Sequence, residues 1–569
     1  MNCHYSLLTT ATAITMLTGG AYAAQAVPVG IASANELELQ NIARTVIHSL
    51  TPAEKEAIVA QDGIGAEALD LASWSWAQPG EARQAEIPSG ISATEWLEMC
   101  LNDDLRASLN EQELAVLFNM AQLLDQGQEL PFFCFSPDAN PDYAFLINEL
   151  LDYQFVSEGG PRFQQGNRWS RTAVDGSGLN QGDATTITYS FVPDGTFVPN
   201  GGLGSGNSTL FAWLDGRYGS TAVWQDLFHQ VFDRWAELTG LTYIWETNDD
   251  GSSLNGAVGF VGVRGDVRIA AFNYPFDGNG GVLAYNSFPN DGDMAIDAYD
   301  NFYNNTNGNS LRLRNVIAHE HGHGLGMAHV CPSSSSKLME PFIALNFDGP
   351  QLDDILNGHR HYGDPFEPTD NFNDAIDLGT FGSSGFASLD NISIDDDSDF
   401  DIFKIELTDR AKITFALSPD ADEYRSGPQT TSCTNGTLVD YDSIQDLKID
   451  LFAADDLFTP VASEDSNGAG GIETLVYDAE DPGVYYAIVL ASSNVNNVQR
   501  YLINMFTTPL PPVECPADLN EDGNLDFFDV SQFLSAFSGM QPDGDFNNDG
   551  NWDFFDISGF LNAFSNGCP

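Results

Sequence analysis

The sequence predicts a multidomain protein: a central α+β domain, a helical segment before it, and an all-β sandwich and a small α-helical domain after it. Three observations lead to this prediction. The chain has 569 residues, which is more than one hydrophobic core normally serves. The spacing of its apolar residues changes from helical to mixed and then to alternating. Near the C-terminus an aspartate-rich loop occurs twice.

The charge of the chain limits the class of partner. It has 21 Lys+Arg against 82 Asp+Glu, a formal net charge of −61. A surface this acidic repels nucleic acid and anionic membranes. No run beyond the N-terminus approaches the ~20 apolar residues of a membrane span. We therefore expect no nucleic-acid partner and no membrane span.

Residues 1–23 are typical of an export signal. Leu7 to Leu17 is a mildly apolar core, and Ala21-Tyr22-Ala23 supplies small residues at a cleavage position. The segment before Leu7 has no Lys or Arg, so a buried structural helix is the alternative. We expect a secreted or extracellular protein. Its six remaining cysteines, an even number, favour disulfide bonds: Cys100, Cys134, Cys331, Cys433, Cys515 and Cys568.

The next two segments differ in the period of their apolar residues. Residues 24–162 are predicted to be helical and poor in strands, with helical spacing across 92–124. Residues 163–365 alternate strand-like runs, such as 186–191, with two helices. One helix spans 224–235 and carries its apolar residues on a single face, which predicts a core contact.

The C-terminal part divides into a sandwich, a linker and a tail. Residues 366–508 contain short alternating runs such as 403–407 and 484–490, separated by Gly, Asp and Asn turns, as in a β-sandwich. Prolines in 509–514 predict a stiff linker. The repeated loops occupy 515–569.

The stretch HEHGHGLGMAH at residues 319–329 is the strongest functional signal. His319 and His323 are four residues apart, so on a helix they point the same way and can bind one ion. Glu320 can then reach a water on that ion. Gly326 can end the helix with positive φ and return His329 as a third ligand. The fourth position stays open, as a catalytic zinc requires.

His321 points away from the other two histidines of the helix, and we expect it to support the site or face solvent. A histidine-rich surface helix without metal is the alternative to a zinc site. The long pattern with its glycine and third histidine makes that alternative a minor one.

This stretch resembles the zinc signature of the metzincin peptidases, and its surroundings resemble the matrixin branch. Leu338-Met339-Glu340-Pro341 is similar to the Met-turn, in which Met339 would form an apolar floor below the metal. Residues 266–270 and 275–284 resemble the family's calcium loop and edge strand. The resemblance implies a metzincin α+β fold and a secreted zinc metalloendopeptidase with one catalytic zinc.

The same resemblance implies calcium in the catalytic domain. The acidic positions of the calcium loop are present as Asp277, Asp297 and Asp300, so one or more structural calcium ions are expected. Two positions that would hold a structural zinc in matrixins are Tyr285 and Ala295, so that second zinc is not expected.

The expected reaction is hydrolysis of peptide bonds in extended protein or peptide substrates. A zinc-bound water would attack the carbonyl with Glu320 as general base. An edge strand at 281–285 would hold the substrate by main-chain hydrogen bonds. A non-catalytic adhesion or surface-assembly protein on the same scaffold is the alternative. The intact Glu320 argues against it.

Residues 24–162 stand where metzincins carry a propeptide. Cys134 resembles the cysteine switch of matrixins, in which a thiolate blocks the zinc, but Phe132 and Phe133 replace the expected arginine. The favoured alternative is a disulfide between Cys100 and Cys134. Residues 366–508 resemble the bacterial pre-peptidase C-terminal domain, and a generic spacer is the alternative.

The tail resembles a dockerin, with two calcium loops of oxygen-bearing residues at EF-hand spacing. The expected ligands are Asp518, Asn520, Asp522, Asp526 and Asp529 in the first loop and Asp545, Asn547, Asp549, Asp553 and Asp556 in the second. A disulfide between Cys515 and Cys568 would join the two ends. The resemblance implies a cohesin-like or cell-surface partner. An acidic disordered tail is the alternative.

Overall fold

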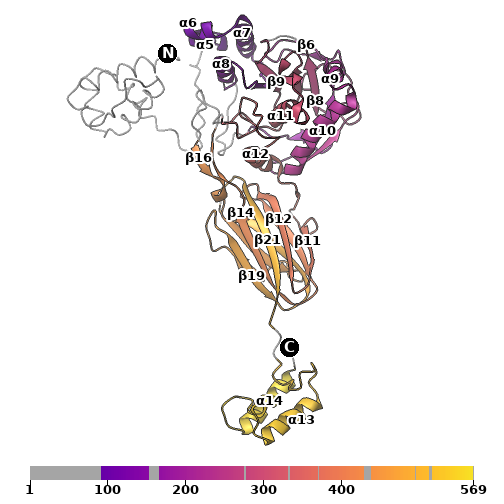
Figure 1. Ribbon diagram of the computed structural model, residues 1–569, viewed down its shortest axis with the longest axis vertical. Helices are drawn as coiled ribbons and strands as arrows, with labels where there is room; N and C mark the ends of the chain where they lie inside the picture. The colour runs from indigo at the N-terminus through magenta and orange to yellow at the C-terminus, as the bar shows by residue number, and fades with distance from the viewer. Residues whose placement is uncertain are drawn as a thin grey trace, which may run out of the picture.

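The computed structural model describes residues 91–152, 166–273, 277–330, 334–369, 371–427, 437–493, 495–511 and 515–567. Figure 1 shows the N-terminal helices and a mixed helix-and-sheet region at the top, a β-rich region in the middle and two helices at the bottom. Mixed helices and several sheets agree with the predicted multidomain α+β protein. The expected signal at 1–23 lies outside the described residues.

The described part of the predicted helical segment is four helices and one strand. Two of the helices begin with capping boxes, Ser92 with Glu95 and Asn110 with Glu113. The elements are α5 (Ala93–Cys100), α6 (Asp103–Ser108), α7 (Glu111–Asp125), β1 (Phe132–Phe135) and α8 (Pro141–Asp152). The strand β1 was not predicted.

The central region contains a six-stranded sheet in the order β1-β9-β10-β8-β4-β7. Its strands after β1 are β4 (Thr185–Phe191), β7 (Leu241–Trp245), β8 (Val267–Phe272), β9 (Val282–Asn286) and β10 (Met294–Asp297). The two short ribbons beside it are β2 (Arg171–Thr172) with β3 (Gly176–Ser177), and β5 (Phe197–Val198) with β6 (Gly206–Asn207). Strand β4 confirms the predicted run at 186–191. The expected edge strand, β9, is not at the edge, because β1 pairs with it antiparallel.

Helices pack on this sheet, and α10 does so through its predicted apolar face. They are α9 (Leu210–Tyr218), α10 (Thr221–Leu238), η3 (Asn301–Asn304), α11 (Asn307–Gly324) and α12 (Leu352–Tyr362). Trp224, Phe228 and Trp235 of α10 are fully buried in the main core, as the sequence predicts. Helix α11 begins with a left-handed turn over residues 308–310 and then runs regularly through the histidines.

A second core joins the N-terminal helices to the central sheet. Leu117, Phe133 and Leu150 share it with Phe272 and Tyr285 of the sheet. The N-terminal elements and the sheet therefore bury one another's apolar surface, which stabilises both.

The region after α12 is two sheets that share one core. One has the order β11-β13-β20-β17-β18 and the other β12-β21-β14-β19. The strands are β11 (Ile376–Phe381), β12 (Gly385–Ile394), β13 (Phe400–Leu407), β14 (Ala411–Pro419), β17 (Leu447–Ala453), β18 (Ala462–Glu464), β19 (Glu473–Ala479), β20 (Gly483–Ala491) and β21 (Gln499–Pro509), beside the hairpin β15 (Glu423–Ser426) and β16 (Thr437–Asp440) with η4 (Tyr441–Ser443). Alternate residues of β14 and β21 are buried, which is the pattern of one solvated and one buried face.

The tail forms α13 (Phe527–Ser538), η5 (Pro542–Gly544) and α14 (Phe554–Asn566). Phe533 and Phe560 stack at a centroid distance of 4.1 Å and centre its small core. Two other aromatic residues of the tail, Phe528 and Phe555, are 64% and 67% exposed. They follow the N-caps Asp526 and Asp553, so they lie in the first helical turn, on the side facing away from the partner helix.

No helix in the described ranges combines the length and the apolar character that crossing a membrane requires.

Candidate metal centre

Helix α11 and the turn after it bring three histidines together. The Nε2 atom of His319 lies 3.1 Å from Nε2 of His323 and 3.3 Å from Nε2 of His329. Zinc–nitrogen bonds of about 2.0–2.1 Å in a tetrahedron put ligand nitrogens roughly 3.3 Å apart. The three imidazoles thus fit one zinc ion, as the sequence predicts.

Hydrogen bonds at Nδ1 fix the orientation of the His319 and His323 rings. Nδ1 of His319 is 2.6 Å from the Leu338 carbonyl oxygen, and Nδ1 of His323 is 2.7 Å from the Met327 carbonyl oxygen. Each carbonyl can only accept, so Nδ1 carries the proton and Nε2 keeps its lone pair for a metal. Burial lowers the pKa of His319 to about 4 and that of His323 well below its usual range. Both rings are therefore neutral, the form that binds metal.

Gly326 makes the turn that returns His329. Its φ is +96°, and a Cβ there would lie 2.3 Å from the Asn167 carbonyl oxygen. The Trp169 indole N–H donates to the Gly324 carbonyl (2.7 Å), and the Tyr362 hydroxyl donates to the Leu325 carbonyl (2.8 Å). These two aromatic contacts brace the turn, and the histidine pattern by itself gave no sign of them.

The segment around Met339 supports the three histidines. Met339 is buried, and its sulfur would lie 2.4 Å from a Cβ on Gly322. The Asp354 carboxylate accepts hydrogen bonds from the main-chain N–H groups of Leu338 (2.9 Å) and Met339 (3.2 Å). Asp354 is thereby a positioning residue for the Leu338 carbonyl that orients His319, a role that sequence reasoning missed.

Glu320 lies beside the histidines and is fully buried. Neither carboxylate oxygen completes a hydrogen bond of good geometry. Burial raises its pKa to about 8, and the nearby thiol and main-chain N–H of Cys134 oppose this rise. An unpaired buried carboxylate is costly, so its place next to three metal-ligand nitrogens points to a role in chemistry.

His321 does not face solvent, which corrects one of the two expectations for it. Its Nε2 is 2.6 Å from the Tyr243 hydroxyl, and its ring packs against Phe232 and Trp235. His321 thus anchors α11 to the core.

Strand β1 crosses this centre. The Phe132 ring lies 5.0 Å from the His323 ring and 5.7 Å from the His329 ring. Cys134 has a free, buried thiol, whereas Cys100 is disulfide-bonded. The favoured Cys100–Cys134 disulfide is therefore wrong. Burial and the Glu320 charge raise the pKa of the Cys134 thiol well above its usual range.

The expected calcium residues of this region are three buried carboxylates. Asp277 accepts from the Val282 N–H (2.7 Å), Asp300 from the Gly280 N–H (2.7 Å) and Asp297 from the Tyr299 N–H (2.8 Å). Within the described part of the chain, Oδ1 of Asp277 and Oδ2 of Asp297 complete no hydrogen bond of good geometry, although the Tyr143 hydroxyl lies near Asp277. Burial raises the pKa of Asp277 to about 7 and that of Asp297 to about 8. Among the described residues, their oxygens do not converge into a group as close as that of the three histidines.

The two tail loops have the same internal geometry. Gly523 and Gly550 have φ of +79° and +80°, and their N–H groups donate to Asp518 (2.8 Å) and Asp545 (2.9 Å). Asp529 and Asp556 accept main-chain N–H groups from within their own loops. Cys515 is disulfide-bonded, and Cys568 lies outside the described residues.

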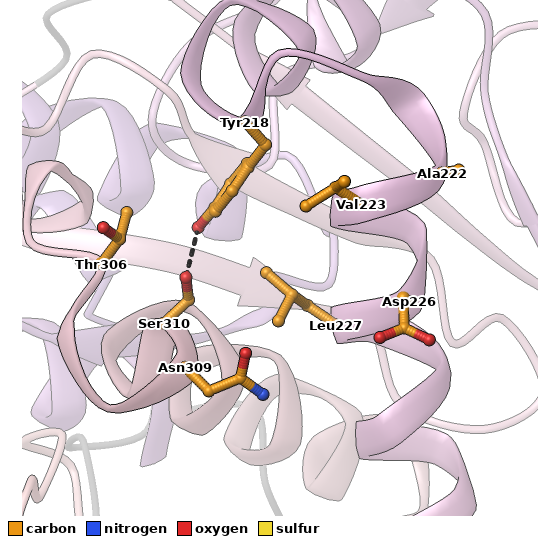
Figure 2. Close-up of a pocket in the computed structure, with 8 residues that line it drawn as sticks. All are labelled: Tyr218, Ala222, Val223, Asp226, Leu227, Thr306, Asn309 and Ser310. Atoms are coloured by element: carbon orange, nitrogen blue, oxygen red, sulfur yellow. Dashed lines mark hydrogen bonds between the residues drawn. The ribbon is translucent and has the colours of Figure 1, made fainter.

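Two further polar sites lie apart from the histidines. A close group of carboxylates, Asp364, Glu367 and Asp401, stands between α12 and the sandwich. A pocket lined by α9, α10 and the start of α11 contains no histidine, and there Tyr218 donates to Ser310 at 2.9 Å (Figure 2). Neither offers an arrangement of base and ligands like that of α11.

Comparison with known proteins agrees with the centre. Residues 217–362 match the sequence model of the peptidase family described as Matrixin. This part of the chain is therefore similar to metalloproteases, and the family implies zinc. Comparison with curated proteins gives no match.

Among solved structures, the pre-peptidase C-terminal domain of a collagenase from Bacillus anthracis is similar. Its identity is 13%, it covers 23% of this chain and 95% of its own, and the TM-score is 0.15. A score this low carries no argument about individual residues.

Proposed function

We propose that this protein is an exported zinc metalloendopeptidase that hydrolyses peptide bonds in extended polypeptide. The observation that carries the proposal is Glu320, fully buried beside three neutral histidines, of which the Nε2 atom of His319 lies 3.1 and 3.3 Å from those of the other two. The match of residues 217–362 to a metalloprotease family supports it.

His319, His323 and His329 would hold the zinc. When bound, the ion lowers the pKa of a water and polarises the carbonyl that this water attacks. Glu320 takes the proton of the water and passes it to the leaving amine nitrogen. The buried Met339 and the Asp354 carboxylate keep the histidines in place.

Strand β9 would bind substrates by main-chain hydrogen bonds. It already pairs with β1 in this way, and adding an extended peptide to a strand is a common mode of recognition. A substrate must therefore displace β1 or bind after β1 has moved.

We also propose that calcium supports the protein. Asp277, Asp297 and Asp300 would hold one ion in the catalytic region, and the two tail loops would hold one each. The expected export of the chain, and a cohesin-like or cell-surface partner for the tail, rest on the resemblances of the sequence alone.

The experiment uses a variant with a weakened β1, Phe132→Ser with Phe135→Ser, here called the opened variant. Hydrolysis of casein is measured with and without the further change Glu320→Ala, together with zinc content by elemental analysis. Glu320→Ala should keep about one zinc yet lose at least roughly 100-fold in rate. Glu237→Ala, at an exposed carboxylate, is the matched control and should not change the rate. Equal rates with and without Glu320 would refute the proposal.

A further inference from the structure

Strand β1 lies between two segments and forms main-chain hydrogen bonds with both. On one side it pairs with β9, so that Phe133 faces Tyr285 and Cys134 faces Ala284. On the other side the Phe135 N–H donates to the Pro341 carbonyl (2.9 Å), and the Ile343 N–H donates to the Phe135 carbonyl (3.0 Å). Both segments border the proposed active site, since β9 is the proposed substrate-binding strand and residues 341–343 follow Met339.

The contacts of two β1 residues indicate which peptide bond lies at the histidine site. Phe132 covers the rings of His323 and His329. Two residues later, the thiol and main-chain N–H of Cys134 lie against the Glu320 carboxylate. The peptide between Phe133 and Cys134 therefore bridges the histidine side and the Glu320 side of the site.

The direction of the strand matches the proton transfer that cleavage needs. Peptide hydrolysis ends with protonation of the leaving nitrogen by the general base. The main-chain N–H of Cys134, whose nitrogen belongs to this same peptide bond, lies close to the Glu320 carboxylate. A strand running the other way would not place the nitrogen of the bridging bond next to the base.

We propose that β1 is bound as a substrate and that the protein cleaves its own chain between Phe133 and Cys134. This inference rests on the proposed function. Water adds to the carbonyl carbon of Phe133, and Glu320 transfers the proton of that water to the Cys134 nitrogen. The C–N bond then breaks, leaving a carboxylate on Phe133 and an ammonium group on Cys134 that holds both protons of the water.

The cleavage also defines the preferred substrate. The site accepts a small side chain after the cut, at the position of Cys134, and aromatic side chains on both sides of it. Phe133 packs against Tyr285, and Phe135 packs against Tyr143 and Phe342. Extended segments of the form Phe-Phe-small-Phe are the class that fits.

The test uses the full chain. After zinc loading and reduction of disulfides, mass spectrometry should find one fragment ending at Phe133 and another beginning at Cys134. The first-order rate should not depend on protein concentration, because the reaction is intramolecular. Glu320→Ala should slow it at least roughly 100-fold. Cys134→Ala should still be cut at this bond, because it keeps the carbonyl and the N–H group, whereas Cys134→Pro, which lacks the N–H, should not.

A second readout needs no activity. In the metal-free chain, the N–H groups of Phe135 and Ser136 should exchange with solvent at least roughly 100-fold more slowly than in a free peptide, as buried main-chain hydrogen bonds require. Fast exchange would overturn the placement of β1.

The outcomes separate this inference from the proposed function. Hydrolysis of casein by the opened variant, with an intact Phe133–Cys134 bond in the zinc-loaded wild type, would overturn self-cleavage alone. A cut at another bond only, or a rate that rises with protein concentration, would also overturn it. Loss of both self-cleavage and casein hydrolysis would overturn the proposed function.

Discussion

The sulfur of Met339 lies directly against Gly322, so close that a Cβ on Gly322 would be 2.4 Å from it. Gly322 sits between His321 and His323 on α11, and the absence of a side chain there lets the methionine reach the underside of the histidines. The glycine of this helix is thus explained by packing rather than by backbone conformation.

Gly322→Ala should therefore destabilise the protein. Moving a buried side chain to make room costs about 1–3 kcal/mol, which a lower midpoint of thermal unfolding would reveal. Gly216→Ala in α9 is the matched control, since a Cβ there meets nothing within 4 Å. The control should be neutral or slightly stabilising. Equal effects of the two changes would contradict the role given to Met339.

Gly326→Ala should lower both stability and zinc content. Alanine at φ of +96° is strained, and its Cβ would also collide with the Asn167 carbonyl. Because the turn carries His329, its distortion should remove the third ligand. Gly219→Ala shares the positive φ (+80°) and has open space around its Cβ. That control should lose some stability but retain zinc; loss of zinc in the control as well would show that the turn is not specific to the centre.

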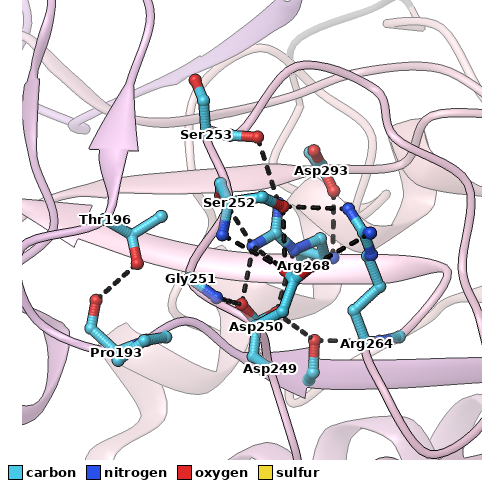
Figure 3. Close-up of polar contacts among 12 residues, drawn as sticks. Pro193, Thr196, Asp249, Asp250, Gly251, Ser252, Ser253, Arg264, Arg268 and Asp293 are labelled. Carbon is cyan, nitrogen blue, oxygen red and sulfur yellow. Dashed lines mark hydrogen bonds and ion pairs between the residues drawn. The ribbon is translucent and has the colours of Figure 1, made fainter.

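Loss of a buried ion pair at the sheet should cost more stability than loss of a surface ion pair. Arg268 donates to both oxygens of Asp249, at 2.6 and 2.9 Å, and the two side chains are 0% and 1% exposed (Figure 3). Arg268→Met should cost about 3–5 kcal/mol by leaving Asp249 charged and unpaired. Arg234→Met removes an exposed pair with Glu237 and should cost less than about 1 kcal/mol. Chemical denaturation of both variants checks the difference.

Calcium should stabilise the full chain. The change in stability caused by Asp297→Asn should have opposite signs with and without calcium. Without calcium, Asp297→Asn should raise stability at neutral pH. Burial beside Asp277 and Asp300 raises the pKa of Asp297 to about 8, so its carboxylate must take up a proton on folding, which asparagine need not do. With calcium, the same variant should be less stable than the wild type and bind one ion fewer. Asp226→Asn, on the outer face of α10, is the control. Thermal unfolding with calcium and with a chelator measures both signs; an Asp297→Asn variant that still gains as much from calcium would refute this site.

The histidine site of α11 could be predicted from the sequence because it depends on residues that are close together in the chain. Helical spacing places His319 and His323 on one face, and only Gly326 permits the turn to His329. The apolar face of α10 was equally readable. These patterns depend on neighbours within about one or two helical turns.

Features that depend on distant contacts were missed or wrong. The run Phe132–Phe135 is four residues long and has no alternation, so nothing local shows that it pairs with β9, about 150 residues later. The free thiol of Cys134 follows from that pairing, which is why the expected link to Cys100 failed. In the tail, apolarity alone would place Phe528 and Phe555 in the core, but both lie in the first turn of their helices and are exposed.

The central claim is that three histidines, without the Cys134 thiol, hold one zinc at the active site. X-ray absorption at the zinc edge of the full chain, loaded with one equivalent of zinc, tests it most directly. We expect a first shell of nitrogen and oxygen only, at about 2.0–2.1 Å, unchanged by Cys134→Ala. A sulfur shell at about 2.3 Å that disappears in Cys134→Ala would contradict it.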